Sequence, residues 1–166
     1  EKFFAERDAA PIVRLVQQDG IALNSIDEID SALELRGYEK QAPSLTMSLD
    51  LSGAMETQAN FKNGSIENLD AGSWLQAWYV LTSRNMEKID VQKTLFEKSD
   101  LSHLFLLKQG FDGAPMSSGM AVYANQSLGL FGISTAMGQR KRGHALDIVN
   151  SLLCWGFAEG AKFAYL

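Results

Sequence analysis

The residues best suited to chemistry form a short basic loop. Residues 138–143 read Gly-Gln-Arg-Lys-Arg-Gly, after an apolar stretch at 128–137 that predicts a strand and before a predicted helix at 144–159. Free N–H groups and the helix dipole make the start of a helix an anion site. Gly143 lets a ligand approach the backbone closely, because it lacks a Cβ atom. Three cations here are unfavourable unless an anion is bound, so the loop suits a pyrophosphate.

The two commonest phosphate-binding motifs are absent from the sequence. There is neither Gly-x-x-x-x-Gly-Lys-Ser/Thr nor Gly-x-Gly-x-x-Gly. What is present is Arg140-x-x-Gly143-x-Ala145 between a strand and a helix. This pattern resembles the Gln/Arg-x-x-Gly-x-Gly/Ala signature of the GCN5-related N-acetyltransferase (GNAT) superfamily, and the resemblance extends over about residues 72–166.

The resemblance implies acetyl-CoA as the cofactor and assigns residues to it by position. The pyrophosphate would be held by Arg140, Lys141, Arg142, Gly143, His144 and Ala145. The pantetheine arm would pair with the backbone of Ile133, Ser134 and Thr135, as an added strand does. The acceptor side would include Trp74, Trp78 and Tyr79.

The reaction implied is direct transfer of an acetyl group to a primary amine of a small molecule or peptide. It needs a general base, and a general acid that the family often places on a helix after the final strand, here beyond Leu166. Residues 131–134 contain no carboxylate, so the catalytic residues are unassigned. Two alternatives are a non-catalytic module that binds acyl-CoA or a partner, and an interaction domain whose loop binds another phosphate.

Helices and strands must follow a particular order along the chain to position these residues. Helices are expected from Gly72 onwards and at 87–98, strands at 101–108, 116–124 and 128–137, then the helix at 144–159 and a strand at 161–166. The buried stripe of the last helix is expected to be Leu146, Val149, Leu152 and Leu153. A right-handed crossover would set the final strand parallel to the one before the loop. The expected fold is therefore α/β (α+β), with a mixed, mostly antiparallel sheet flanked by helices.

The N-terminal part has a vaguer resemblance to a second lobe of this type. We expect the end of a helix at 1–10, a strand at 11–16, and a helix that starts with the capping box Ser25/Glu28 and ends before Gly37. Alternation over 45–51 predicts a half-buried strand, and a short strand is possible at 61–66. We interpret residues 1–51 as the closing half of a degenerate lobe and 53–166 as a GNAT domain, truncated at its C-terminal end.

The composition of the chain narrows the classes of protein and of binding site that remain. A net charge of −5 argues against nucleic-acid binding, and no apolar run is long enough to span a membrane. Cys154 is the single cysteine and the two histidines are scattered, so we expect no disulfide and no metal site. Without a targeting signal the expected location is cytoplasmic. A homodimer, or pairing of tandem lobes within one chain, is compatible with the sequence.

Overall fold

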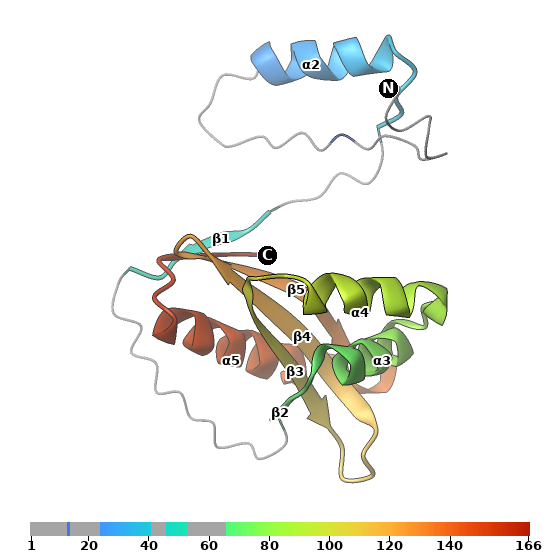
Figure 1. Cartoon of the computed structure of the whole chain (residues 1–166), viewed down its shortest axis with the longest axis vertical. Helices are drawn as coiled ribbons and strands as arrows, with labels where there is room; N and C mark the ends of the chain where they lie inside the picture. Colours follow the sequence, from blue (N-terminus) through green and yellow to red (C-terminus); the bar gives the residue numbers. More distant parts are fainter. Residues whose placement is uncertain (1–12, 14–23, 41–45, 53–65) are drawn as a thin grey trace. The chain divides into compact units, whose positions relative to one another are not determined.

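The computed structural model describes residues 13, 24–40, 46–52 and 66–166 (Figure 1). The elements expected at 1–10 and 11–16, and all but the last residue of the strand at 61–66, lie outside the described residues. The chain divides into two compact units, Glu1–Leu45 and Thr46–Leu166.

In the first unit, helix α2 spans Asn24–Glu34. It begins before the predicted cap at Ser25 and ends two residues before Arg36. The predicted stop at Gly37 is confirmed, because its N–H donates to the carbonyl of Glu34 and the N–H of Tyr38 donates to that of Leu33. These two bonds form a Schellman motif.

The second unit contains a six-stranded sheet in the order β1-β6-β5-β4-β3-β2. The strands are β1 (Ser48–Asp50), β2 (Ile66–Asn68), β3 (Ser102–Gln109), β4 (Pro115–Ala124), β5 (Ser127–Thr135) and β6 (Phe163–Tyr165). All neighbours are antiparallel except β5 and β6, which are parallel. The mixed, mostly antiparallel sheet and the parallel crossover strand are therefore confirmed.

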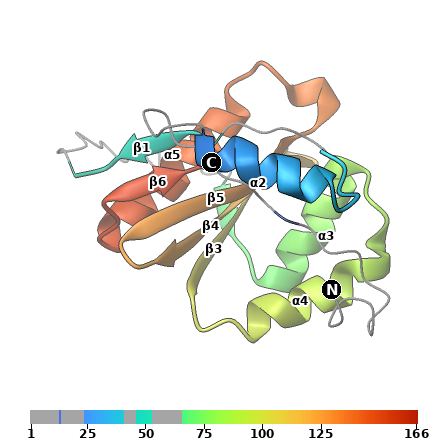
Figure 2. The same ribbon diagram turned by 90° about the horizontal axis from the view of Figure 1, so that it is seen from above.

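Helices pack on opposite faces of this sheet (Figure 2). Helix α3 (Ala71–Thr82), the 3-10 turn η1 (Met86–Lys88) and helix α4 (Ile89–Glu97) precede β3, and helix α5 (His144–Ala158) connects β5 to β6. Side chains alternate along a strand, so Phe105 of β3 packs in the cluster of α3, whereas Leu106 packs in the cluster of α5.

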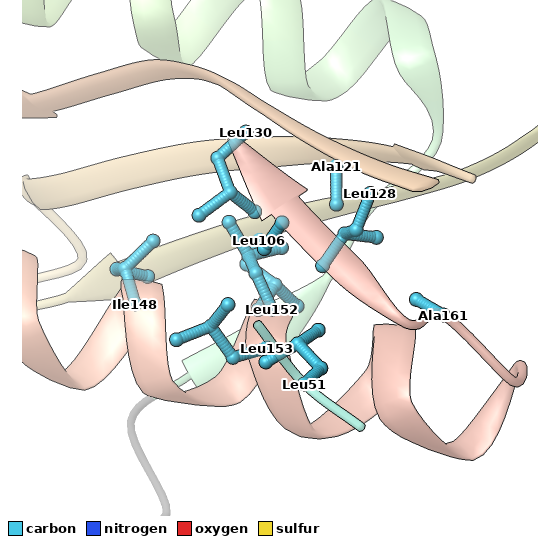
Figure 3. Close-up of a cluster of buried hydrophobic side chains, with 10 residues drawn as sticks. Leu51, Leu106, Ala121, Leu128, Leu130, Ile148, Leu152, Leu153 and Ala161 are labelled. Carbon is cyan, nitrogen blue, oxygen red and sulfur yellow. The ribbon is translucent and has the colours of Figure 1, made fainter. Parts of the chain in front are cut away.

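Figure 3 shows the core between α5 and the sheet. Leu152 and Leu153 of α5 are buried there, as predicted, and Val149 packs against them. Leu146 was predicted in the same stripe and this is wrong: its side chain is 61% exposed, and Ile148 is buried instead. Ile148 and Leu152 are four residues apart, so they lie on one side of the helix, whereas Leu146 points elsewhere.

The N-terminal edge of the sheet also differs from the prediction. Met47 and Leu49 are exposed, and Leu51 is the residue of this stretch that reaches the core. The prediction of a half-buried strand is therefore wrong for Met47 and Leu49. Their strand, β1, lies at the edge of the sheet and pairs with β6 alone. The two compact units divide at Leu45/Thr46, so β1 belongs to the second unit. That residues 1–51 are the closing half of a degenerate lobe and 53–166 a GNAT domain stays a prediction.

Candidate functional site

The loop between β5 and α5 has a folded backbone with two left-handed residues. After Thr135, the 3-10 turn η2 (Met137–Gln139) follows, and Lys141 and Gly143 then have φ values of 61° and 85°. The loop is tied to the sheet by the N–H of Ala136, which donates to the carbonyl of Met116 at 2.9 Å. The backbone is thus left-handed on both sides of Arg142.

The start of α5 has no cap from a side chain. Gly143 stands at the N-cap position, and the first N–H bonded to its carbonyl is that of Asp147, at 3.0 Å. The N–H groups of the first turn, at His144, Ala145 and Leu146, are therefore left without helical partners. Such a helix end attracts a negatively charged group.

Three exposed cations lie next to these N–H groups. Arg140, Lys141 and Arg142 are exposed, and none of the ion pairs formed within the described residues involves them. The Nε atom of Arg140 donates to the carbonyl of Thr135 at 3.3 Å, which links the loop to the end of β5. The structure thus brings together the residues that the motif predicted for the pyrophosphate.

Buried serines of β4 support the end of β5 beneath the loop. The hydroxyl of Ser117, fully buried, donates to the carbonyl of Ser134 at 2.8 Å and lies 3.0 Å from the Oγ1 atom of Thr135. The Oγ atom of Ser118 donates to the carbonyl of Gly132 at 3.4 Å. These contacts hold the strand that leads into the loop. These residues were not predicted, because isolated serines in a strand give no distinctive pattern.

Strand β5 contains a bulge at Gly132. Between Ser118 and Met120 of β4, the partner in β5 moves from Ser134 to Phe131, so β5 holds one extra residue there. Gly132 has a φ of 62°, and a Cβ atom at this position would be 2.8 Å from the indole ring of Trp74. A glycine inside a strand is a signal for such a bulge, and it could have been used from the sequence alone.

Beyond the bulge, one edge of β5 is open. The pairing with β6 covers only Ser127 to Gly129, so residues 130–135 have no partner strand on that side within the described parts of the chain. The predicted residues Ile133, Ser134 and Thr135 all lie on this edge. The side chain of Ile133 packs toward the α5 core, so its backbone is what the edge offers to a ligand.

The predicted acceptor residues separate into two groups. Trp74 and Trp78 line a cavity of about 320 Å³ between α3, α4 and β5, with their rings stacked at 5.7 Å. Tyr79 does not line that cavity. Its buried side chain belongs to the core, and its hydroxyl donates to the Oε1 atom of Gln92 at 3.0 Å. A role for any of the three in binding a substrate stays a prediction.

Some polar atoms near these features have no partner among the residues described. The Nε1 atoms of Trp74 and Trp78, the Nδ1 atom of His144 and the Oε1 atom of Gln139 are buried without a hydrogen bond. Leaving such an atom unsatisfied costs about 1–3 kcal/mol. Two of these atoms belong to residues that line the cavity, and the other two belong to residues of the loop and of the start of α5.

Two further findings concern other classes of site. Within the described ranges, no group of three or more His, Cys, Asp or Glu side chains is arranged to hold a metal ion. None of the helices described is both long and apolar enough to cross a bilayer.

Comparison with known proteins identifies similar folds. No protein-family model and no curated protein matches the sequence. A GCN5-related N-acetyltransferase from Sphaerobacter thermophilus is 17% identical, with a TM-score of 0.56 over 82% of this chain and 46% of its own. A glucosamine N-acetyltransferase region of a fungal multi-domain beta-N-acetylglucosaminidase is 15% identical, with a TM-score of 0.58 over 95% of this chain and 22% of its own.

A third similar structure is a protein assigned to the GNAT family from Novosphingobium aromaticivorans. It is 17% identical, with a TM-score of 0.53 over 77% of this chain and 57% of its own. The chain thus spans between 22% and 57% of the length of these three solved structures. At these identities the likeness establishes the fold.

Proposed function

We propose that this chain, which has the fold of the GCN5-related N-acetyltransferases, transfers an acetyl group from acetyl-CoA to a primary amine. One observation carries the proposal: the uncapped, basic start of α5 follows directly on the bulged, open-edged end of β5. A phosphate site and a free strand edge in this order suit a ligand that has a pyrophosphate at one end and an amide-containing arm at the other.

The residues at the start of α5 fit a pyrophosphate. Arg140, Lys141 and Arg142 supply positive charge, and the N–H groups of Gly143, His144 and Ala145 supply donors at the positive end of the helix dipole. A Cβ atom added at Gly143 would meet nothing within 4 Å, so the space beside the backbone is open. A phosphate oxygen could therefore approach these N–H groups.

In this proposal the protein acts mainly by holding two reactants in place. Acetyl-CoA, when bound, supplies an activated acetyl thioester. The loop residues hold the pyrophosphate, and the backbone of Ile133, Ser134 and Thr135 orients the pantetheine arm along β5. The amine nitrogen of the acceptor attacks the thioester carbonyl carbon, so that the C–N bond forms as the C–S bond breaks.

The test is a calorimetric titration of acetyl-CoA into the full chain and two variants. We expect Kd near the micromolar range for the wild type and binding at least about tenfold weaker in Gly143→Asp, which adds negative charge where the pyrophosphate would lie. Gly160→Asp is the matched control, because Gly160 has a similar φ of 91° at the opposite end of α5. Equal affinity in all three proteins, or no binding by the folded wild type, would contradict the proposal.

A second candidate is a module that binds acyl-CoA without turnover. It is favoured by the absence of any ionisable side chain from residues 131–135, where a carboxylate could have served as a base. Binding of acetyl-CoA without acetylation of any amine in a broad panel would support it.

The expected location and the expected dimer or tandem-lobe pairing stay predictions.

A further inference from the structure

The cavity beside the bulge has walls that specify the kind of acceptor. Resting on the proposed acetyl transfer, we propose that the acceptor is a monoamine with an aromatic or branched aliphatic body, which occupies the cavity between α3, α4 and β5. The cavity volume of about 320 Å³ corresponds to roughly ten water volumes, enough for one ring with a short arm.

The walls are almost entirely hydrocarbon. They include the side chains of Trp74, Trp78, Leu95, Phe96, Met120 and Phe131. Among the residues that line it, none carries a charge, and the one polar side chain is Gln92. A sugar or a peptide rich in hydroxyl and amide groups would lose its water here without gaining partners, whereas an apolar body gains from burial.

The residues that line the cavity offer an ammonium group no counter-charge, because none of them is a carboxylate. The one polar side chain among them is Gln92, and its Oε1 atom already accepts a hydrogen bond from the Tyr79 hydroxyl. In addition, the guanidinium of Arg84 lies 4.5 Å from the ring centroid of Trp78 and would repel an acceptor with several positive charges.

The same walls favour the reactive form of a monoamine. Desolvation in apolar surroundings lowers the pKa of an alkylammonium group, which increases the fraction of neutral amine. The neutral nitrogen then has the lone pair that attack requires. This effect reduces the need for a carboxylate base, which residues 131–135 do not provide.

The cavity also lies beside the part of β5 that is proposed to orient the thioester. Gly132 lines the cavity and is the bulge residue of β5, directly before Ile133 on the open edge. An amine at this end of the cavity would lie next to the strand that orients the pantetheine arm. The reaction balances as R–NH₂ plus the thioester giving R–NH–CO–CH₃ plus the free thiol, which takes up the proton that nitrogen loses.

The experiment measures thiol release from acetyl-CoA with six amines. Phenethylamine, tryptamine and isoamylamine are compared with spermidine, glucosamine and lysine, and acetyl-CoA affinity is measured separately by calorimetry. We expect kcat/KM for the three apolar amines to be at least about tenfold higher than for the polar ones. Trp78→Ala should raise KM for phenethylamine by about tenfold without changing Kd for acetyl-CoA. Trp78→Phe should raise this KM by less, because the phenyl ring replaces part of the lost contact.

The control variant is Trp155→Phe, because Trp155 packs in the α5 cluster on the other face of the sheet. It should leave KM for phenethylamine unchanged. If acetyl-CoA binds and spermidine or glucosamine is the preferred acceptor, this inference is overturned while the proposed function stands. If the folded protein binds no acetyl-CoA or acetylates none of the amines, both fail.

Discussion

Lys108 of β3 and Asp147 of α5 form an ion pair beneath the basic loop, with Nζ and Oδ2 2.5 Å apart. The lysine side chain is 9% exposed and the carboxylate 36% exposed. Lys108 is thus a nearly buried charge, and its partner stands in the first turn of the helix whose start is the proposed pyrophosphate site. The pair joins the sheet to that helix and offsets the negative charge of Asp147 near the site.

The two halves of this pair are expected to differ in their effect on stability. Asp147→Asn leaves a nearly buried ammonium without its counter-charge and should lower the free energy of unfolding by about 2 kcal/mol. Lys108→Met should cost less, because water can hydrate the half-exposed carboxylate that remains. Urea unfolding of the wild type and both variants measures this, and a larger loss in Lys108→Met would contradict the argument.

The contact between α5 and β5 at Gly156 is too close for any side chain. A Cβ atom there would be 2.3 Å from the Cδ2 atom of Leu128, which is fully buried. Gly156→Ala should therefore destabilise the protein by about 1–3 kcal/mol, despite the better helix propensity of alanine. Gly138→Ala is the control, because nothing lies within 4 Å of its added Cβ. Equal thermal midpoints for the two variants would show that the core adapts freely.

The N-cap of α3 should make stability depend on pH in acid. Asp70 accepts hydrogen bonds from the Ser73 hydroxyl and from the N–H groups of Ser73 and Gly72, and these bonds hold its pKa below the ordinary 3.8. Because the folded pKa is lowered, the contribution to stability is complete above pH 3.8 and is lost as pH falls through the folded value.

The matching experiment compares Asp70→Ala with the wild type across pH by urea unfolding. The variant should be less stable at pH 7, and the difference should shrink as the pH falls below 3.8. A difference that stays constant down to pH 2 would mean that the ionised carboxylate does not act as the cap.

The single cysteine is expected to be unreactive in the folded protein. Burial in helix α5 raises the pKa of the Cys154 thiol above its ordinary value of 9.0, so less thiolate is present at a given pH. Alkylation by iodoacetamide at pH 8 should be slower for the native protein than for the protein in urea. Equal rates would show that the thiol is as available in the fold as in the unfolded chain.

Much of the fold could be predicted because its signals are local. The helices at α3, α4 and α5 follow the 3.6-residue spacing of their apolar residues, and the strands β3, β4 and β5 are apolar runs separated by turn residues. The errors fall where burial depends on distant partners. Leu146 and Leu49 fit a local pattern, but no element among the described residues buries their side chains, which are exposed.

For the candidate site, the motif from Arg140 to Ala145 was visible because a loop site is contiguous in sequence. The cavity was only partly visible: Trp74 and Trp78 were selected for their type, and Tyr79 was selected with them although its side chain lies in the core. Which face of a helix reaches a cavity is decided by the packing of that helix, and spacing alone does not separate Trp78 from Tyr79.

Local signals were enough to predict the order of the elements, the basic loop at a strand-to-helix turn and the stop signal at Gly37, because each depends on a few consecutive residues. Two other features appear only in the folded protein. They are the pairing of Lys108 with Asp147 across 39 residues and the apolar cavity bounded by α3, α4 and β5. Each depends on contacts between segments far apart in the chain, whose register and angles are set only when the sheet and helices pack together.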